Sequence, residues 1–177
     1  MKALFNREKT KGFTLLELLV VITIIGILAT VLMASFATAR ENARDEVRKN
    51  DLKALQLAIE LYKSQNGTYP ARGCGATSGW TGPGSHSASW GTECDEYIDG
   101  LVPDYIAELP TDPNQEDVDN WGYIYWTDGN SYKVLAHLVV ENKVTTSPDD
   151  EFARYPAQCG SNQNTTYAVY SAGAECI

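Results

Sequence analysis

The chain has 177 residues, of which 44% are hydrophobic and 10% aromatic, a composition that suffices for a packed core and excludes a wholly disordered chain. Its formal net charge is −9, and the acidic excess is concentrated in residues 73–177, which contain three basic and sixteen acidic residues. This region would repel a phosphate backbone, so direct nucleic-acid binding by it is disfavoured.

The N-terminal part combines a basic leader with a long apolar run. Residues 1–12 contain four basic side chains and one acidic one, and the 22 residues from Leu18 to Ala39 carry no charge. About 20 apolar residues in a helix cross the hydrocarbon layer of a bilayer, so we expect a membrane-spanning helix. The run is longer than the apolar part of a cleaved secretory signal and continues into a helical pattern at Arg40. We therefore expect the helix to remain in the mature protein.

The orientation of this helix follows from the cysteines rather than from the basic residues. Four Lys and Arg residues precede the span and five follow it by residue 53, so the positive-inside rule does not decide. All four cysteines lie after the span, in a polar region without a Cys-x-x-Cys pair. Such cysteines are typical of disulfides formed in an oxidising compartment. We expect the N-terminus in the cytoplasm and the bulk of the chain outside.

Glu17 is an anomaly because it interrupts an otherwise apolar stretch. A carboxylate in a membrane costs a few kcal/mol unless it is paired or lies near the interface, so it either marks the edge of the membrane or has a function. The segment Lys11-Gly-Phe-Thr-Leu-Leu-Glu17 resembles the processing site of type IV prepilins and pseudopilins. The resemblance is close over residues 7–40 and looser to about residue 70. It implies cleavage by a membrane peptidase between Gly12 and Phe13, and N-methylation of Phe13.

The resemblance also implies a role for Glu17 in assembly. Cleavage would remove the basic leader and create a terminal amine on Phe13, with a reference pKa of about 7.7–8.0. An unpaired carboxylate buried among helices would cost roughly 3–5 kcal/mol. We expect the Phe13 amine of one subunit to neutralise Glu17 of another. Many relatives have a proline in the apolar half, but Val31–Phe36 contains none, so a kink there is not carried over.

The span is expected to continue as one helix over residues 13–66. Charges interleave from Arg40 to Lys53 at helical pair spacing, for instance Asp45 with Lys49, which predicts a solvated helical segment. Apolar residues then recur on a face that should pack on the following domain, namely Leu52, Leu55, Ile59 and Tyr62. Gly67 is the expected C-terminal cap.

The remainder predicts a small β-rich head. Residues 71–95 are expected to form a long loop whose tryptophans, Trp80 and Trp90, either cover the core or form an adhesive patch. Tyr97–Leu109 is expected to be a short helix. Gly122–Val140 predicts two strands around an Asp-Gly turn, and Tyr167–Tyr170 predicts a third strand.

The expected fold class is α+β, with a long N-terminal helix packed on a small antiparallel sheet as in pilins. Its expected divisions are a cleaved leader (1–12), a transmembrane and assembly helix (13–39), an amphipathic continuation (40–70) and an acidic, disulfide-containing head (71–177). Three pairings of the cysteines are possible, and we expect the sequence neighbours to pair. Proximity alone supports Cys74–Cys94, whereas the closed C-terminal loop common in pilins also supports Cys159–Cys176.

One acidic segment is a candidate calcium site. Its oxygen ligands are Asp112, Asn114, Glu116, Asp117 and Asp119. The spacing excludes an EF-hand, because Asp117 stands at the turn glycine and Tyr123 at the bidentate glutamate. The surrounding sequence resembles the calcium-binding region of major pseudopilins, and an acidic solvated loop is the alternative. We expect no other cofactor. No local grouping of nucleophile and base is present, so we expect no enzyme activity.

These observations predict a structural subunit of a type IV pilus or related filament, processed after Gly12 and polymerised through its N-terminal helix. One alternative is a pseudopilin of a type II secretion or DNA-uptake system. Another is a membrane-anchored extracytoplasmic binding protein that does not polymerise. Expected partners are further copies in a helical filament, the prepilin peptidase and methyltransferase, and an inner-membrane assembly platform, with minor pilins left open. The expected location is the cytoplasmic membrane before assembly, and a surface pilus or periplasmic pseudopilus afterwards.

Overall fold

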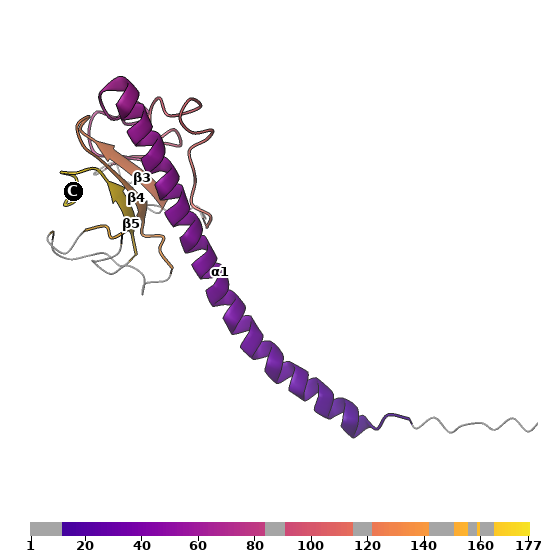
Figure 1. The fold of residues 1–177 in the computed structure, drawn as a ribbon. Helices are drawn as coiled ribbons and strands as arrows, with labels where there is room; N and C mark the ends of the chain where they lie inside the picture. Colours follow the sequence, from indigo (N-terminus) through magenta and orange to yellow (C-terminus); the bar gives the residue numbers. More distant parts are fainter. Residues whose placement is uncertain (1–11, 84–90, 115–121, 142–150, 156–158, 160–164) are drawn as a thin grey trace, which may run out of the picture. The chain divides into compact units, whose positions relative to one another are not determined.

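The computed structural model describes residues 12–83, 91–114, 122–141, 151–155, 159 and 165–177 (Figure 1). The chain forms two compact units, residues 1–40 and residues 41–177. One helix, α1 (Leu15–Asn66), contributes its first part to the first unit and its remainder to the second. The long helix predicted for residues 13–66 is confirmed.

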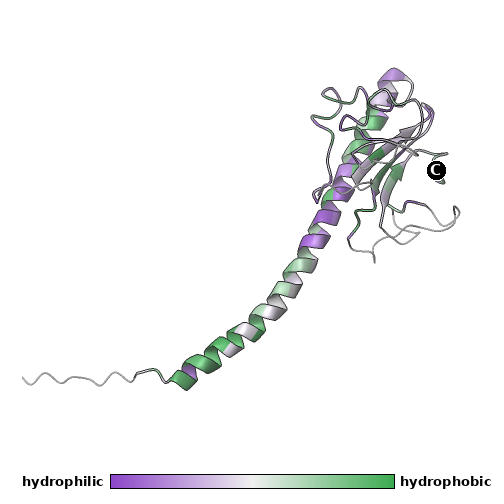
Figure 2. Cartoon of the chain, turned by 180° about the vertical axis from the view of Figure 1, so that it is seen from behind, coloured by the Kyte–Doolittle hydropathy of each residue, from purple (hydrophilic) through white to green (hydrophobic). Residues whose placement is uncertain are grey.

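The helical part of the first unit is apolar and uncovered (Figure 2). All its described side chains are exposed, and the helix is long and apolar enough to cross a membrane. Two polar side chains in it are satisfied locally, because Thr23 and Thr30 donate their hydroxyl protons to the carbonyls of Val20 and Ile27 at 2.8 and 2.7 Å. Neither hydroxyl needs a partner from outside the helix. Continuous helix through residues 31–36 agrees with the absence of a proline there.

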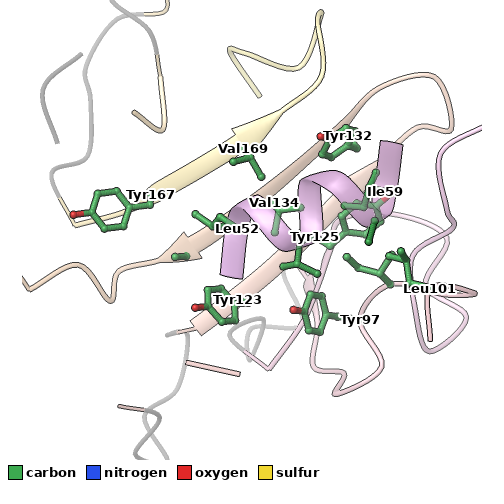
Figure 3. Packing of buried hydrophobic residues seen from close by; sticks show 14 of the residues in the cluster. Leu52, Ile59, Tyr97, Leu101, Tyr123, Tyr125, Tyr132, Val134, Tyr167 and Val169 are labelled. Carbon is green, nitrogen blue, oxygen red and sulfur yellow. The ribbon is translucent and has the colours of Figure 1, made fainter. Parts of the chain in front are cut away.

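In the second unit, the remainder of α1 packs on the sheet through the predicted face. Leu52, Leu55 and Ile59 are completely buried, and Figure 3 shows Leu52 and Ile59 against the tyrosines of the strands. Burial of these side chains is the main force that holds the helix to the sheet. The helix ends at Asn66, and Gly67, with φ +81°, donates its N–H to the Lys63 carbonyl at 2.8 Å as the expected cap.

The sheet has five strands in the order β2-β1-β3-β4-β5. The strands are β1 (Trp80–Thr81), β2 (Gly91–Thr92), β3 (Gly122–Thr127), β4 (Tyr132–His137) and β5 (Tyr167–Tyr170). The predicted hairpin and third strand are confirmed as the antiparallel run β3-β4-β5. The segment predicted as a long loop instead contributes β1 and β2, which pair in parallel, so the sheet is mixed rather than antiparallel. Two-residue strands leave too little alternation in a sequence to be predicted.

The hairpin turn between β3 and β4 is built on Asp128 and Gly129. The Asp128 side chain accepts the N–H groups of Asn130 and Ser131 at 2.9 and 2.6 Å. Gly129 has φ +87°, a conformation that a side chain would disfavour. The turn therefore fixes the register in which Thr127 faces Tyr132.

The strands are buried on both faces, which explains why their sequences do not alternate. One face packs against α1 through a cluster rich in tyrosine (Figure 3). The other face carries a smaller cluster of Ile124, Leu135 and Ala168, with Trp80 and Tyr170 packed against it. Trp80 thus covers the core, in agreement with the first alternative for the loop, while Trp90 lies outside the described residues.

The short helix predicted for Tyr97–Leu109 is wrong. The segment is a series of turns, in which Gly100 has φ +73° and Pro103 lacks an N–H group. Both features oppose a continuous helix. Three of its apolar residues, Tyr97, Ile98 and Leu101, are buried from separate turns. The Tyr97 hydroxyl donates to the Pro110 carbonyl at 3.0 Å.

Two disulfides connect neighbouring cysteines of the sequence, Cys74 with Cys94 and Cys159 with Cys176. These are the expected pairs. The first joins the segments that flank β1 and β2, and the second ties the C-terminal turn to the segment before β5. Both lie in the second unit, so they constrain the head rather than the apolar helix.

Candidate assembly site

Glu17 lies in the first turn of α1 and forms a capping box with Thr14. The Thr14 N–H and hydroxyl both donate to Glu17 Oε2 at 2.8 Å, and the Glu17 N–H donates to Thr14 Oγ1 at 3.2 Å. This reciprocal pattern satisfies N–H groups that a helix start leaves free. Sequence analysis missed this role, although Thr14-Leu-Leu-Glu17 carries the spacing that signals it.

The expected cleavage point lies immediately before this cap. Gly12 and Phe13 precede α1 outside any helix or strand, and Phe13 is 84% exposed. An exposed, irregular segment of this kind is the form of backbone that a protease can bind. Lys11 and the rest of the basic leader lie outside the described residues.

The charge of Glu17 has no counterion among the described residues of the first unit. Between Gly12 and Arg40, the only basic side chain is Arg40 itself. At about 1.5 Å per residue, it lies roughly 35 Å further along the helix axis. Among the residues described from Gly12 to Arg40, Glu17 is therefore a carboxylate without a nearby cation.

In the second unit, by contrast, a charged side chain of α1 is buried and paired within the chain. Arg48 is only 1% exposed, and its guanidinium donates to three carboxylates. The bonds run to Asp112 at 2.6 and 2.9 Å, to Asp45 at 2.6 Å and to Glu141 at 3.0 Å. The predicted solvated segment is thus wrong at Asp45 and Arg48, which are buried against the head. Helical pair spacing could not reveal these partners, because Asp112 and Glu141 are distant in sequence.

The pKa values of this cluster follow from its pairing. Burial alone would lower the pKa of Arg48, but the bonds to Asp112, Asp45 and Glu141 outweigh it and raise the pKa above the ordinary value. The pKa of Glu141 is lowered, chiefly by its hydrogen bonds with Arg44. Arg48 and Glu141 therefore stay ionised at neutral pH. The cluster joins α1 to the segments before and after the β3-β4 hairpin.

Comparison with known proteins identifies the family. Residues 7–33 match the prokaryotic N-terminal methylation motif. The type II secretion system core protein G of Aeromonas hydrophila is 34% identical over 120 residues, covering 68% of this chain and 73% of that protein. The corresponding protein of Vibrio cholerae is 34% identical over 125 residues, covering 70% and 75%. The chain belongs to the type II secretion core protein G family. The type II secretion system core protein G of Pseudomonas aeruginosa is 38% identical over 66 residues, covering 37% of this chain and 46% of that protein. No solved structure matches the chain.

The structure describes only two of the five candidate calcium ligands, Asp112 and Asn114. Both oxygens of Asp112 accept bonds from Arg48, and Asp112 Oδ1 also accepts the Asn114 N–H at 2.9 Å. Asp112 is thus committed to a guanidinium and does not fit as a metal ligand here. Glu116, Asp117 and Asp119 lie outside the described residues. In the part of the chain that is described, no group of three or more His, Cys, Asp or Glu side chains could hold a metal ion.

His137 is the one histidine among the described residues. His137 lies on β4, and burial, followed by the nearby charge of Arg154, lowers its pKa to about 4. The side chain is therefore neutral at physiological pH. His86 lies outside the described residues.

Proposed function

We propose that the protein is a pseudopilin, a structural rather than catalytic subunit of the filament of a type II secretion system. Before assembly it would be anchored in the cytoplasmic membrane by α1, with its head outside. A peptidase would cleave it after Gly12 and methylate Phe13. The family membership favours this role over a surface pilus. The observation that carries the proposal is Glu17, the single charged residue between Gly12 and Ala39, which lies within the matched methylation motif.

The capping box gives the proposed pairing a geometry. Both bonds from Thr14 end on Glu17 Oε2, so among the described residues Oε1 is left for an external donor. Cleavage would create an ammonium group on Phe13, one residue before Thr14. A subunit entering the filament could then offer this ammonium to Glu17 of its neighbour, which neutralises both charges away from water.

Glu17→Gln tests the charge separately from the cap. Glutamine also serves in capping boxes, so the helix start would be retained while the negative charge is lost. We expect normal membrane insertion, cleavage and methylation, measured by intact mass, but at least a tenfold loss of sheared filaments on immunoblots. Thr14→Ala is the matched control, since it weakens the cap, keeps the charge and should reduce filament yield only slightly.

Gly12→Val tests the requirement for processing. We expect the uncleaved chain to accumulate in the membrane without filaments. Normal filaments from Glu17→Gln or from uncleaved Gly12→Val would overturn the proposal. If the full chain of 177 residues persisted in cells that have the peptidase, a membrane-anchored binding protein would be favoured instead.

A further inference from the structure

The turns between β2 and β3 border a groove on the surface of the head, the acidic groove. It encloses about 470 Å³, within the size range of pockets that bind ligands. Its lining combines apolar and acidic side chains, namely Ile98, Val102, Leu109, Asp95, Glu96, Asp99 and Glu108. Val102, at 44%, is the only exposed large hydrophobic residue that the structure describes after α1. The groove therefore offers apolar surface and negative charge at one place.

The four carboxylates of the acidic groove are not neutralised by the chain itself. No described residue forms an ion pair or a side-chain hydrogen bond with them. Residues 91–114 contain seven acidic residues and no basic one. A hollow lined by charges of one sign concentrates ions of the opposite sign. We therefore expect a cationic occupant.

The placement of these carboxylates disfavours a metal ion as that occupant. Among the residues that the structure describes, no three Asp, Glu, His or Cys side chains are grouped so that they could hold one. A divalent cation requires several oxygen ligands around a single point. Carboxylates that border a groove without converging suit a ligand that carries several cationic groups.

Lysine and arginine side chains match both features of the acidic groove. Each has an alkyl stem that packs on apolar surface and a charged head that remains in water. Val102 and Leu109 would contact the stem, and the exposed carboxylates of Asp99 and Glu108 would receive the head. A peptide segment can present several such side chains at once. The expected occupant is therefore a basic peptide segment.

A second copy of this chain is a poor source of such a segment. Residues 73–177 contain three basic and sixteen acidic residues, so two heads repel each other. The described basic side chains of the second unit also have contacts within their own chain; they are Arg44, Arg48, Lys49, Lys53, Lys63, Arg72, Lys133 and Arg154. The complementary charge is therefore expected from a different protein.

The acidic groove has its shape before any partner binds. The Asp99 N–H donates to the Ala71 carbonyl, and the Tyr105 N–H donates to the Leu101 carbonyl, both at 3.0 Å. Cys94, immediately before the groove, is fixed by its disulfide. A surface that is already ordered loses little conformational entropy on binding.

We propose that the acidic groove binds a basic peptide segment of another protein. The inference goes beyond the proposed function, because it concerns the head alone and requires no contact between copies of this chain. It assigns a recognition role to the turns between β2 and β3, in addition to the part that their buried residues have in the core.

Binding of a defined peptide to the full-length protein in detergent tests the charge of the occupant. The probe is a fluorescein-labelled peptide of alternating lysine and alanine, and its control is the same peptide with every lysine acetylated. Acetylation keeps the alkyl stem and removes the charge. We expect fluorescence anisotropy to show binding of the first peptide that weakens as ionic strength rises from about 0.05 to about 0.3 M. The acetylated peptide should bind at least tenfold more weakly.

Charge-matched variants test the place of binding. Asp99→Asn combined with Glu108→Gln should weaken binding about fivefold, as expected for the loss of exposed ion pairs. Glu41→Gln combined with Asp104→Asn removes two acidic charges of the same unit that do not line the groove, and should change the affinity less than about twofold. Val102→Thr keeps the shape but adds a hydroxyl group, so it should weaken binding about twofold at an unchanged melting temperature.

The outcomes separate this inference from the proposed function. No binding to the unmodified chain, equal binding of the acetylated peptide, or equal loss of affinity in both double variants would overturn the inference. Loss of filaments from Asp99→Asn with Glu108→Gln would also overturn it, because a second copy would then occupy the groove. Normal filaments from this variant, together with weakened peptide binding, would support the inference. None of these binding results alters the proposed function, which the variants of Glu17 and Gly12 test.

Discussion

The two parts of α1 differ in where their side chains find partners. In residues 15–40 the described apolar side chains are exposed, and the one carboxylate has no nearby cation among the residues described there. In residues 41–66 the sheet covers Leu52 and Ile59, and three carboxylates surround Arg48. The second part therefore finds its partners within its own chain, whereas no described residue covers the side chains of the first part. Changes in the first part should alter assembly, and changes in the second should alter unfolding.

Arg48→Met should produce the largest change in stability. It leaves Asp45 and Asp112 buried without their cation, which we expect to lower the free energy of unfolding by about 3–5 kcal/mol. Urea unfolding of the full chain in detergent measures it. Lys53→Met is the matched control and should cost less than about 1 kcal/mol, because its pair is exposed. Equal unfolding of the two variants would show that the buried Arg48 cluster adds no more to stability than an exposed pair does.

The disulfides should stabilise the head alone. Replacing Cys159 and Cys176 together by serine should lower the free energy of unfolding by about 3 kcal/mol, because the bond closes a loop with a sequence separation of 17. The pair Cys74 and Cys94, with a separation of 20, should cost a similar amount. Cleavage and methylation at Phe13, read from intact mass, should be unaffected. A processing defect without loss of stability would contradict the separation of the two units.

Lys133 should make the stability of the head depend on pH. It is buried on β4 and donates to the carbonyls of Glu175 and Ile177 at 2.7 and 2.9 Å. Burial, and then the charge of Arg154, lowers its pKa to about 7 from the ordinary 10.5. Between these values the unfolded chain binds more protons, so the free energy of unfolding should rise as pH increases from 7 toward 10.

Lys133→Met supplies the control for this dependence. The variant should flatten the rise between pH 7 and 9.5 in urea unfolding curves. The upper limit avoids the buried tyrosines, such as Tyr132, whose pKa is raised chiefly by burial and which would lower stability above pH 10. An unchanged pH slope in the variant would show that another group carries the effect.

Calcium should give the smallest change. If Asp117 and its neighbours hold the ion, millimolar calcium should raise the melting temperature of the head by at least about 2 °C, as about 1 kcal/mol does in a unit of this size. Asp117→Ala should abolish the shift. If calcium gives no shift in melting temperature, the segment is an acidic loop without a bound ion. Arg48 is then the only cation bonded to Asp112 among the described residues.

The features predicted from sequence are those whose signal is local. The apolar run, the repeat of Leu52, Leu55 and Ile59, and the Asp128-Gly129 turn each carry a pattern within a few residues. Features that depend on distant partners were missed. Nothing near Arg48 indicates that Asp112 and Glu141 will surround it. The segment around Gly100 forms turns that bury Ile98 and Leu101 separately.

The assembly site was also only partly predictable. The motif around Gly12 indicated Phe13 and Glu17, because family resemblance attaches to a short continuous segment. The bond from Thr14 was not predicted, although Thr14 and Glu17 have the spacing of a capping box.

The capping box has a consequence for the entropy of docking. If cleavage occurs after Gly12, only two residues precede α1, and Thr14 is already held by Glu17. Ordering a flexible residue costs roughly 1–2 kcal/mol, so a longer free end would weaken each insertion. Because Thr14 is already fixed, only about one residue per subunit would lose conformational entropy on insertion. The lower entropic cost applies to every subunit that is added.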